Sequence, residues 1–198
     1  MFDKKTADKI DKFLHQNLSI IFDFEFNGLL LLGGGAVKGF IMNTAIKDYD
    51  FFLLTQEKDN IMDFINKYNL KYQINPGHGY TIYYNNLLIG INSTNDLCYI
   101  GNYNTDFLFY DIHRKQFIPI GIKQAIDKRK IIIYEYIGYP RIEKRKSLAK
   151  RLNTAKQFIQ YMNNDTKKVK VVRKNKYYQR LFIGFIKKPQ KITKLFRG

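Results

Sequence analysis

The sequence predicts an α/β or α+β head followed by a basic, helical carboxyl-terminal part. Short apolar runs alternate with stretches whose apolar residues recur at helical spacing. Hydrophobic residues make up 45% of the 198 residues, which is enough for one substantial core. Basic residues are concentrated in the second half of the chain. We therefore expect a head over residues 1–139 and a basic helical extension over residues 140–198.

The first third of the chain alternates between helix and strand. In order, we expect a helix over 6–18, a strand over 28–33, a helix over 36–46, a strand over 49–54 and a helix over 57–69. Thr6 is the expected amino-terminal cap of the first helix, because its hydroxyl can accept a hydrogen bond from a free backbone N–H. Gly39 weakens the second helix by about 1 kcal/mol relative to Ala.

Strands are expected to dominate the next part of the chain. Two hairpins pair 80–84 with 87–91 and 105–111 with 116–120; then come a helix over 122–129, a strand or helix start over 130–137, a basic helix over 141–162 and a basic, aromatic-containing tail. Asn85 and Asn86 lie between the strands of the first hairpin, and asparagine tolerates the left-handed geometry of a tight turn. No internal repeat interrupts this order.

Two carboxylates lie one residue apart at the start of the strand expected over 49–54. Residues two apart on a strand share a face, so Asp48 and Asp50 should point together while Tyr49 and Phe51 face the core. Two carboxylates this close repel each other unless a cation lies between them. Mg²⁺ or Mn²⁺ fits, because hard oxygen ligands hold such ions and leave coordination sites for water and substrate phosphates.

Three consecutive glycines join the preceding strand to the next helix. Gly33, Gly34 and Gly35 let the backbone approach a ligand closely, and the amino terminus of a helix presents free N–H groups to phosphate. Phosphate, metal and carboxylates would then converge. This is the chemistry of phosphoryl transfer, in which paired metal ions about 3.5–4 Å apart stabilise the attacking and the leaving oxygen.

The order of apolar strand, Gly-Gly, short helix and Asp-x-Asp resembles the nucleotidyltransferase superfamily, which includes DNA polymerase β and poly(A) polymerases. The resemblance is greatest to the head of CCA-adding tRNA nucleotidyltransferases, which reads Gly-Gly-x-Val-Arg-Asp followed by Asp-x-Asp; small bacteriophage nucleotidyltransferases are also similar. Residues 34–38 fit the first motif, with Lys38 in place of Arg and Gly39 in place of Asp. The likeness covers about residues 25–112 and implies a mixed sheet flanked by helices.

The resemblance also implies roles for individual residues. Gly33, Gly34, Gly35 and Lys38 would bind the nucleotide triphosphate, and Asp48 and Asp50 would hold the metal ions. The family needs a third carboxylate on a later antiparallel strand, which would complete the metal site and activate the acceptor hydroxyl. Asp106 is the first candidate, because apolar residues follow it; Asp96 and Asp111 are the alternatives.

Charge is divided unevenly along the chain. Residues 1–112 carry 9 Lys and Arg against 13 Asp and Glu, whereas residues 113–198 carry 25 against 4, a balance of +21. Such a polycationic half attracts the phosphate backbone of nucleic acids. Basic residues that share faces of the expected helix over 141–162 are the candidate contacts: Arg141, Arg145, Lys146, Lys150 and Arg151.

The cellular compartment follows from the cysteine content and the amino-terminal residues. Cys98 is the only cysteine, so no intrachain disulfide forms and a reducing compartment is expected. The first residues carry mixed charges instead of the apolar core of a signal peptide, and no apolar run is long enough to cross a membrane. We expect a cytoplasmic protein, in the host cytoplasm if the AT-rich composition reflects a viral source.

The sequence thus predicts a metal-dependent nucleotidyltransferase that uses an NTP as donor and a nucleic-acid 3′ hydroxyl, of RNA or tRNA, as acceptor. Two alternatives stay open. One is a toxin-like enzyme that transfers the nucleotide to a protein or small molecule. The other is a non-catalytic nucleic-acid-binding protein in which the acid pair is vestigial.

Overall fold

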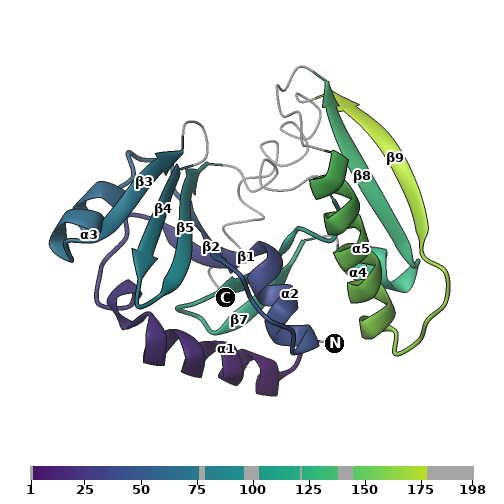
Figure 1. Ribbon diagram of the computed structural model, residues 1–198, viewed down its shortest axis with the longest axis horizontal. Coiled ribbons are helices and arrows are strands. Elements are labelled where there is room, and N and C mark those ends of the chain that lie inside the picture. The colour runs from purple at the N-terminus through teal and green to yellow at the C-terminus, as the bar shows by residue number, and fades with distance from the viewer. Residues whose placement is uncertain (1, 76–78, 96–102, 121, 138–144, 178–198) are drawn as a thin grey trace.

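The computed structural model describes residues 2–75, 79–95, 103–120, 122–137 and 145–177 (Figure 1). Seven strands form one mixed sheet in the order β3-β4-β5-β2-β1-β6-β7. These strands are β1 (Leu29–Gly33), β2 (Tyr49–Leu54), β3 (Lys71–Asn75), β4 (Gly79–Tyr84), β5 (Leu87–Thr94), β6 (Leu108–Asp111) and β7 (Gln116–Pro119). Only β2 and β5 pair in parallel; the other neighbours are antiparallel.

The helices that precede β3 in the chain cover one face of this sheet. In chain order, the helices of the described residues are α1 (Lys4–Asn17), the short 3-10 helix η1 (Ser19–Ile21), α2 (Gly34–Met42), α3 (Ile61–Lys67), α4 (Ile122–Asp127) and α5 (Arg145–Met162). The apolar sides of α1, α2 and α3 pack on alternate residues of the central strands, such as Leu30 and Leu32 of β1. Leu31 faces the other side with Phe52 and Phe109. The mixed sheet flanked by helices confirms the predicted fold class.

The hairpin between β4 and β5 confirms the turn predicted from two asparagines. Asn85 has φ 49° and Asn86 has φ 61°, so both central residues are left-handed. Positive φ at both positions matches the right-handed twist of the flanking strands. Asn tolerates this region better than other residues with a side chain, which explains the choice here.

Several helix boundaries differ from the prediction. The side chain of Asp3, not Thr6, caps α1 and accepts a hydrogen bond from the Thr6 backbone N–H at 2.8 Å. The second helix ends at Met42, because Asn43 adopts φ 54° and turns the chain away. The third begins only at Ile61 instead of residue 57.

The second half of the chain builds a smaller lobe beside the sheet (Figure 1). β8 (Lys130–Ile137) pairs in parallel with β9 (Lys170–Tyr177), and α5 connects the two strands. Ala155 and Ile159 of α5 pack against Ile131 and Ile133 of β8. Phe158 belongs to the main core and fastens this lobe to the head.

The position expected for the domain boundary, between residues 139 and 140, lies between β8 and α5 of this lobe. A basic helix was expected after it, and α5 is that helix. The prediction that the whole extension is helical is wrong for β9, because this segment is a strand held by its pairing with β8; residues 178–198 lie outside the described residues. None of the helices in the described ranges is long and apolar enough to span a bilayer.

Candidate active site

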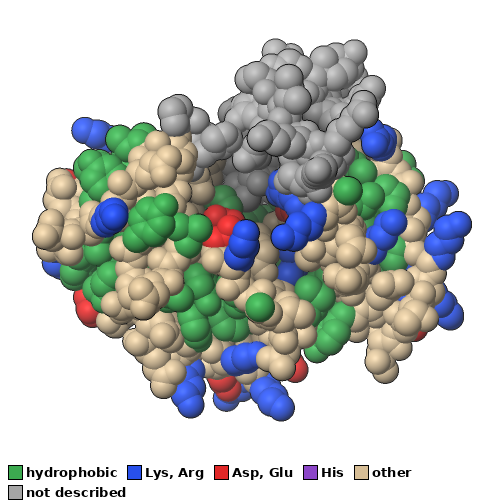
Figure 2. Space-filling model, in the orientation of Figure 1, with side chains coloured by type: hydrophobic (Ala, Val, Ile, Leu, Met, Phe, Trp, Pro, Cys, Tyr) green, Lys and Arg blue, Asp and Glu red, His purple; other side chains and the backbone are tan. Residues whose placement is uncertain are grey.

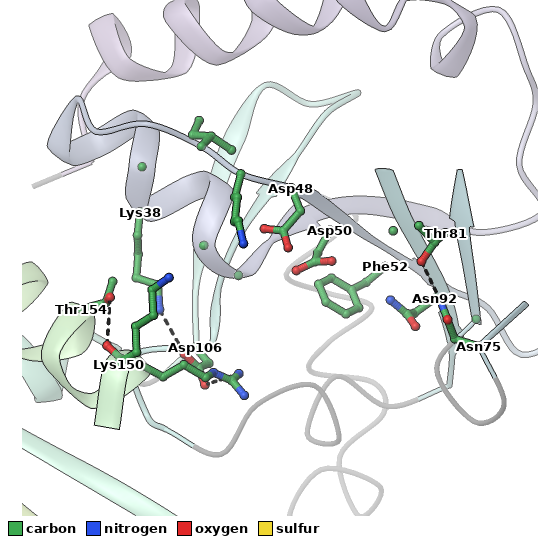
Figure 3. Close-up of a pocket in the computed structure, with 18 of the residues that line it drawn as sticks. Lys38, Asp48, Asp50, Phe52, Asn75, Thr81, Asn92, Asp106, Lys150 and Thr154 are labelled. Atoms are coloured by element: carbon green, nitrogen blue, oxygen red, sulfur yellow. Dashed lines mark hydrogen bonds and ion pairs between the residues drawn. The ribbon is translucent and has the colours of Figure 1, made fainter. Parts of the chain in front are cut away.

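A cleft of about 1470 Å³ lies between the helix-free face of the sheet and α5. Residues from α2, β2, β3, β4, β5 and α5 line it, together with Asp106 (Figure 3). Its volume exceeds the roughly 300–1,000 Å³ that is common for small-molecule pockets. The cleft has room for a nucleotide and part of a second substrate.

The aspartate pair lies at the centre of this cleft. Asp48 directly precedes β2 and is exposed, whereas Asp50 is the second residue of the strand and is partly buried. Both carboxylates point into the cleft (Figure 3). Tyr49 and Phe51 face the opposite side and are buried in the core, as the strand alternation predicted.

Two glycines make room for the Asp50 carboxylate. Asp50 pairs in register with Gly33 of β1 on one side and Gly90 of β5 on the other. A Cβ at position 90 would lie 2.7 Å from Asp50 Oδ1, and one at Gly34 would lie 3.3 Å from Asp50 Oδ2. Gly34 also adopts φ +62°, where a side chain is strained. Side chains at 90 and 34 would crowd the carboxylate.

Burial, together with the nearby negative charge of Asp48, raises the pKa of Asp50 to about 6, while Arg151 acts in the opposite direction. Removing a carboxylate from water disfavours its charged form, and a second carboxylate adds repulsion. The charged forms of the two carboxylates are therefore unfavourable side by side, and a bound cation would offset their repulsion.

The amino terminus of α2 opens onto the same point. The helix begins at Gly34 with Gly33 as its cap, and no side chain caps it. Its first backbone N–H groups have no acceptor within the helix, so they favour an anionic ligand. Among the residues that the structure describes, none lies within 4 Å of the position that a Cβ of Gly35 would occupy, so they leave the cleft open there.

Lys38 does not extend freely into the cleft, where the sequence analysis expected it to hold phosphate. Its Nζ donates a hydrogen bond to Asp106 Oδ1 at 3.0 Å, and only 7% of the Lys38 side chain and 10% of the Asp106 side chain are exposed. Arg151 Nη2 lies 3.6 Å from Asp106 Oδ2. The Asp106 carboxylate therefore joins α2 of the head to α5 of the smaller lobe, and these three residues form what we call the ionic hub.

Asp106 was predicted on a strand, and this was wrong. It lies in a turn before β6, where its backbone N–H donates to Tyr103 O at 2.9 Å. The turn is fastened to β8, because the Asn104 side chain accepts from Ile132 N and donates to Lys130 O, both at 2.9 Å. These long-range bonds, which no local pattern reveals, hold the segment out of the sheet.

The predicted third metal ligand stays a prediction. Within the described ranges, no three Asp, Glu, His or Cys side chains cluster closely enough to hold a metal, so Asp106 stands apart from the aspartate pair. Asp111 is buried at the end of β6, where its Oδ1 accepts from the backbone N–H groups of His113 and Arg114 at 3.0 Å. Asp96 lies outside the described residues.

One side of α5 forms the wall of the cleft that faces α2. The lining side chains recur at helical spacing: Lys150, Arg151, Thr154, Gln157 and Tyr161. Lys150 and Arg151, two of the predicted nucleic-acid contacts, line the cleft, and their contact with nucleic acid stays a prediction. Arg145 and Lys146 lie at the first turn of α5, and Arg141 lies outside the described residues.

Gly90 and Asn92 are among the cleft residues on β5 that were not predicted from the sequence. A glycine inside the apolar run 87–91 was a usable signal, because glycine in a strand often marks a close approach. Asn92 carried no comparable signal.

The packing around Gly39 explains why a glycine stands there. A Cβ at this position would lie 2.6 Å from Ile46 Cγ1, so the aspartate that the resembling family has at this point of its motif would not fit.

Comparison with known proteins gives distant structural neighbours. No protein-family model and no curated protein matches the chain. A CCA-adding enzyme of Thermotoga maritima complexed with tRNA is 14% identical, with a TM-score of 0.49 over 83% of this chain and 45% of that one. A tRNA nucleotidyltransferase with a primer tRNA and an ATP analogue is 13% identical, with a TM-score of 0.43 over 74% and 49%. A tRNA-processing enzyme in an apo form is 10% identical, with a TM-score of 0.46 over 67% and 38%. The chain thus spans less than half the length of these proteins.

Proposed function

We propose that this protein is a metal-dependent nucleotidyltransferase that moves a nucleoside monophosphate from an NTP to a nucleic-acid 3′ hydroxyl, with RNA, and tRNA foremost, as acceptor. One observation carries the proposal. The paired carboxylates of Asp48 and Asp50 meet the uncapped amino terminus of α2 inside a cleft whose other wall is basic. Carboxylates, phosphate-binding N–H groups and cations are the parts that phosphoryl transfer requires.

The donor set of the aspartate pair suits Mg²⁺ or Mn²⁺. Asp48 and Asp50 supply hard carboxylate oxygens, and the raised pKa of Asp50 reflects a negative charge that lacks compensation. A bound divalent ion would neutralise the charge that develops on the transferred phosphoryl group. Mg²⁺ commonly uses one or two carboxylates together with substrate phosphates, so two aspartates suffice.

The remaining residues of the cleft orient the donor. The backbone N–H groups at Gly34 and Gly35 would donate hydrogen bonds to the triphosphate oxygens, and Lys150 and Arg151 would lie beside the leaving pyrophosphate. Asp106 is placed to keep Lys38 and Arg151 on that side of the cleft. In the transfer, the acceptor hydroxyl releases its proton to water and its oxygen bonds to the α-phosphorus, while the bond from the α-phosphorus to the bridging oxygen breaks and pyrophosphate leaves.

The basic second half supports a nucleic-acid acceptor. Residues 113–198 carry a balance of +21, which a small-molecule acceptor does not require. In Figure 2, Lys and Arg side chains lie beside the acidic group at the middle of the visible face and along the smaller lobe. A polyanion would be drawn toward the aspartate pair by these charges.

The test is incorporation of each of the four labelled NTPs, with Mg²⁺, into total cellular RNA. We expect label on RNA with the wild type and none with the double variant Asp48→Asn/Asp50→Asn, whereas salt-sensitive RNA binding persists in both. Label on protein instead would move the acceptor to the toxin-like class. RNA binding with no transfer at all would identify a non-catalytic binding protein.

A further inference from the structure

The wall of the cleft that β3, β4 and β5 form differs chemically from the α5 wall. Its polar side chains are all uncharged, and they include Asn75, Thr81 and Asn92, which we call the neutral wall. We propose that the neutral wall is the subsite for the terminal nucleoside of the acceptor strand, which it binds on the side of the aspartate pair opposite the cations. This inference rests on the proposed function and names the place of its second substrate.

The strand register places the neutral wall on the same sheet face as the metal site. Asp50 pairs with Gly90, and Gly90 pairs with Thr81 across the next strand. Asn92 lies two residues beyond Gly90 and pairs with Phe52, so its side chain shares that face. Asn75 joins them through its Nδ2, which donates to Thr81 Oγ1 at 2.6 Å (Figure 3).

The cations lie on the other side of β2. In the sheet order, β5, β4 and β3 follow β2 in one direction, whereas β1 and β6 follow it in the other. The ionic hub belongs to that second side, because α2 follows β1 and Asp106 precedes β6. Figure 3 shows Lys38, Asp106 and Lys150 to one side of Asp48 and Asp50, and the neutral wall to the other.

The geometry of phosphoryl transfer assigns a substrate to each side. The attacking and leaving oxygens lie roughly in line through the α-phosphorus, so they occupy opposite sides of it. Pyrophosphate carries most of the negative charge and belongs with the cations. The attacking 3′ hydroxyl must then approach from the neutral wall, and the nucleoside that bears it lies against that wall.

The neutral wall has the hydrogen-bonding chemistry that a nucleoside needs. An amide side chain both donates and accepts, so it can bind the edge of a base without attracting a charged group. Asn92 is partly exposed and, among the described residues, its side chain has no hydrogen-bond partner. No Lys, Arg, Asp or Glu from the described residues of β3, β4 or β5 lines the cleft. The absence of a side chain at Gly90 also leaves Asp50 open toward this wall.

The test measures binding of a short oligoribonucleotide with a 3′-deoxy end, followed by fluorescence anisotropy, so that no transfer is needed. The variants are Asn92→Ala and, as a second change that keeps the side-chain shape, Thr81→Val. Asn66→Ala is the matched control, because Asn66 is an exposed asparagine on α3 outside the cleft. A second oligomer lacks the base of its last nucleotide.

We expect Asn92→Ala and Thr81→Val to weaken binding of the intact oligomer about 3- to 10-fold, as the loss of one or two neutral hydrogen bonds would. The same variants should bind the abasic oligomer nearly as well as the wild type does, while binding of a fluorescent NTP and all properties of Asn66→Ala stay unchanged.

Equal loss of affinity for both oligomers would indicate a structural effect and overturn the inference. Weakened NTP binding with unchanged oligomer binding would assign the wall to the donor nucleoside and also overturn it. Failure of the wild type to transfer any nucleotide, with the expected binding pattern retained, would overturn the proposed function alone.

Discussion

At the scale of single residues, the Asp50 carboxylate lies in surroundings that disfavour its charged form and so lower the stability of the folded protein. It is held between Gly34 and Gly90 beside a second carboxylate, and its pKa is raised to about 6. This arrangement does not stabilise the carboxylate, whereas an aspartate on the open surface would keep its contact with water. The cost is consistent with a site kept for a cation.

The raised pKa of Asp50 predicts how stability depends on pH without divalent metal. The folded-state pKa lies above the unfolded value, so ionisation disfavours the folded state and stability falls as the pH rises from about 4 to 6. Asp50→Asn removes this cost. We expect the variant to be about 1–3 kcal/mol more stable than the wild type at pH 7 and nearly equal to it at pH 4, measured by urea unfolding.

Asp23→Asn is the control for that measurement, because Asp23 is exposed on the surface. It should leave the pH dependence of the wild type intact. An Asp50→Asn protein that follows the wild-type pH profile would contradict the burial and charge repulsion assigned to this carboxylate.

Gly90→Ala tests the space around the same carboxylate. The added Cβ would lie 2.7 Å from Asp50 Oδ1, so the carboxylate must move. We expect a fall in Mn²⁺ affinity of at least about tenfold, since displaced ligands lose their geometry. Gly35→Ala, whose Cβ meets no atom within 4 Å, controls for the effect of the substitution on thermal stability. Unchanged Mn²⁺ binding in Gly90→Ala would show that this contact does not position Asp50.

The aspartate pair and the glycines were predictable because their signal is local. Residue spacing on a strand places Asp48 and Asp50 together, and glycine before a helix indicates a close approach. The contacts of Gly90 and Gly39 were not predictable in this way. Their neighbours, Asp50 and Ile46, come from other segments that only the fold brings together.

At the scale of elements, the ionic hub joins α2, the turn before β6 and α5. Lys38 and Asp106 are both nearly buried, so each charge depends on the other. The turn is also fastened to β8 through Asn104. The hub therefore fixes the position of the helix that carries Arg151 relative to the helix that begins at the glycines.

Asp106→Asn should lower the free energy of unfolding by about 3 kcal/mol or more, because it leaves the Lys38 ammonium buried without a counter-charge. The double variant Lys38→Met/Asp106→Asn should lose less than the sum of its single changes. Arg151→Ala should cost about 1 kcal/mol or less, because 40% of that side chain is exposed and its pair distance is 3.6 Å. Urea unfolding measures all three, and equal losses for Asp106→Asn and Arg151→Ala would contradict the hub.

The element boundaries show where sequence patterns lose information. The strands around the Asn85–Asn86 turn follow local alternation, and the structure confirms them. The segment of Asp106 has the composition of a strand, yet hydrogen bonds from Asn104 to β8 hold it as a turn. The parallel pairing of β8 with β9 likewise depends on residues about forty positions apart.

At the scale of the whole molecule, the aspartate pair lies in a cleft beside a basic lobe. The charge division of the sequence predicted this separation, and the positions of Lys150 and Arg151 agree with it. The sequence did not predict that the two lobes share a core through Phe158. A shared core favours a fixed cleft over two independently moving parts.

The basic lobe predicts salt-dependent RNA binding. Lys150 lines the cleft, so Lys150→Ala should reduce the slope of log binding constant against log salt concentration by about 0.7–0.9, the contribution of one phosphate contact. Lys12→Ala removes an exposed lysine of α1, on the helix-covered side, and should leave the slope unchanged. Equal slopes for Lys150→Ala and the wild type would place the RNA elsewhere.

The central claim is that Asp48, Asp50 and the amino terminus of α2 together form a metal–triphosphate site. Binding of Mn²⁺ to the protein with a non-hydrolysable NTP, followed by electron paramagnetic resonance, tests it most directly. The account predicts that the wild type binds Mn²⁺ more tightly when the NTP is present and that Asp48→Asn/Asp50→Asn loses this gain. Equal NTP-dependent Mn²⁺ binding by the wild type and the double variant would contradict it.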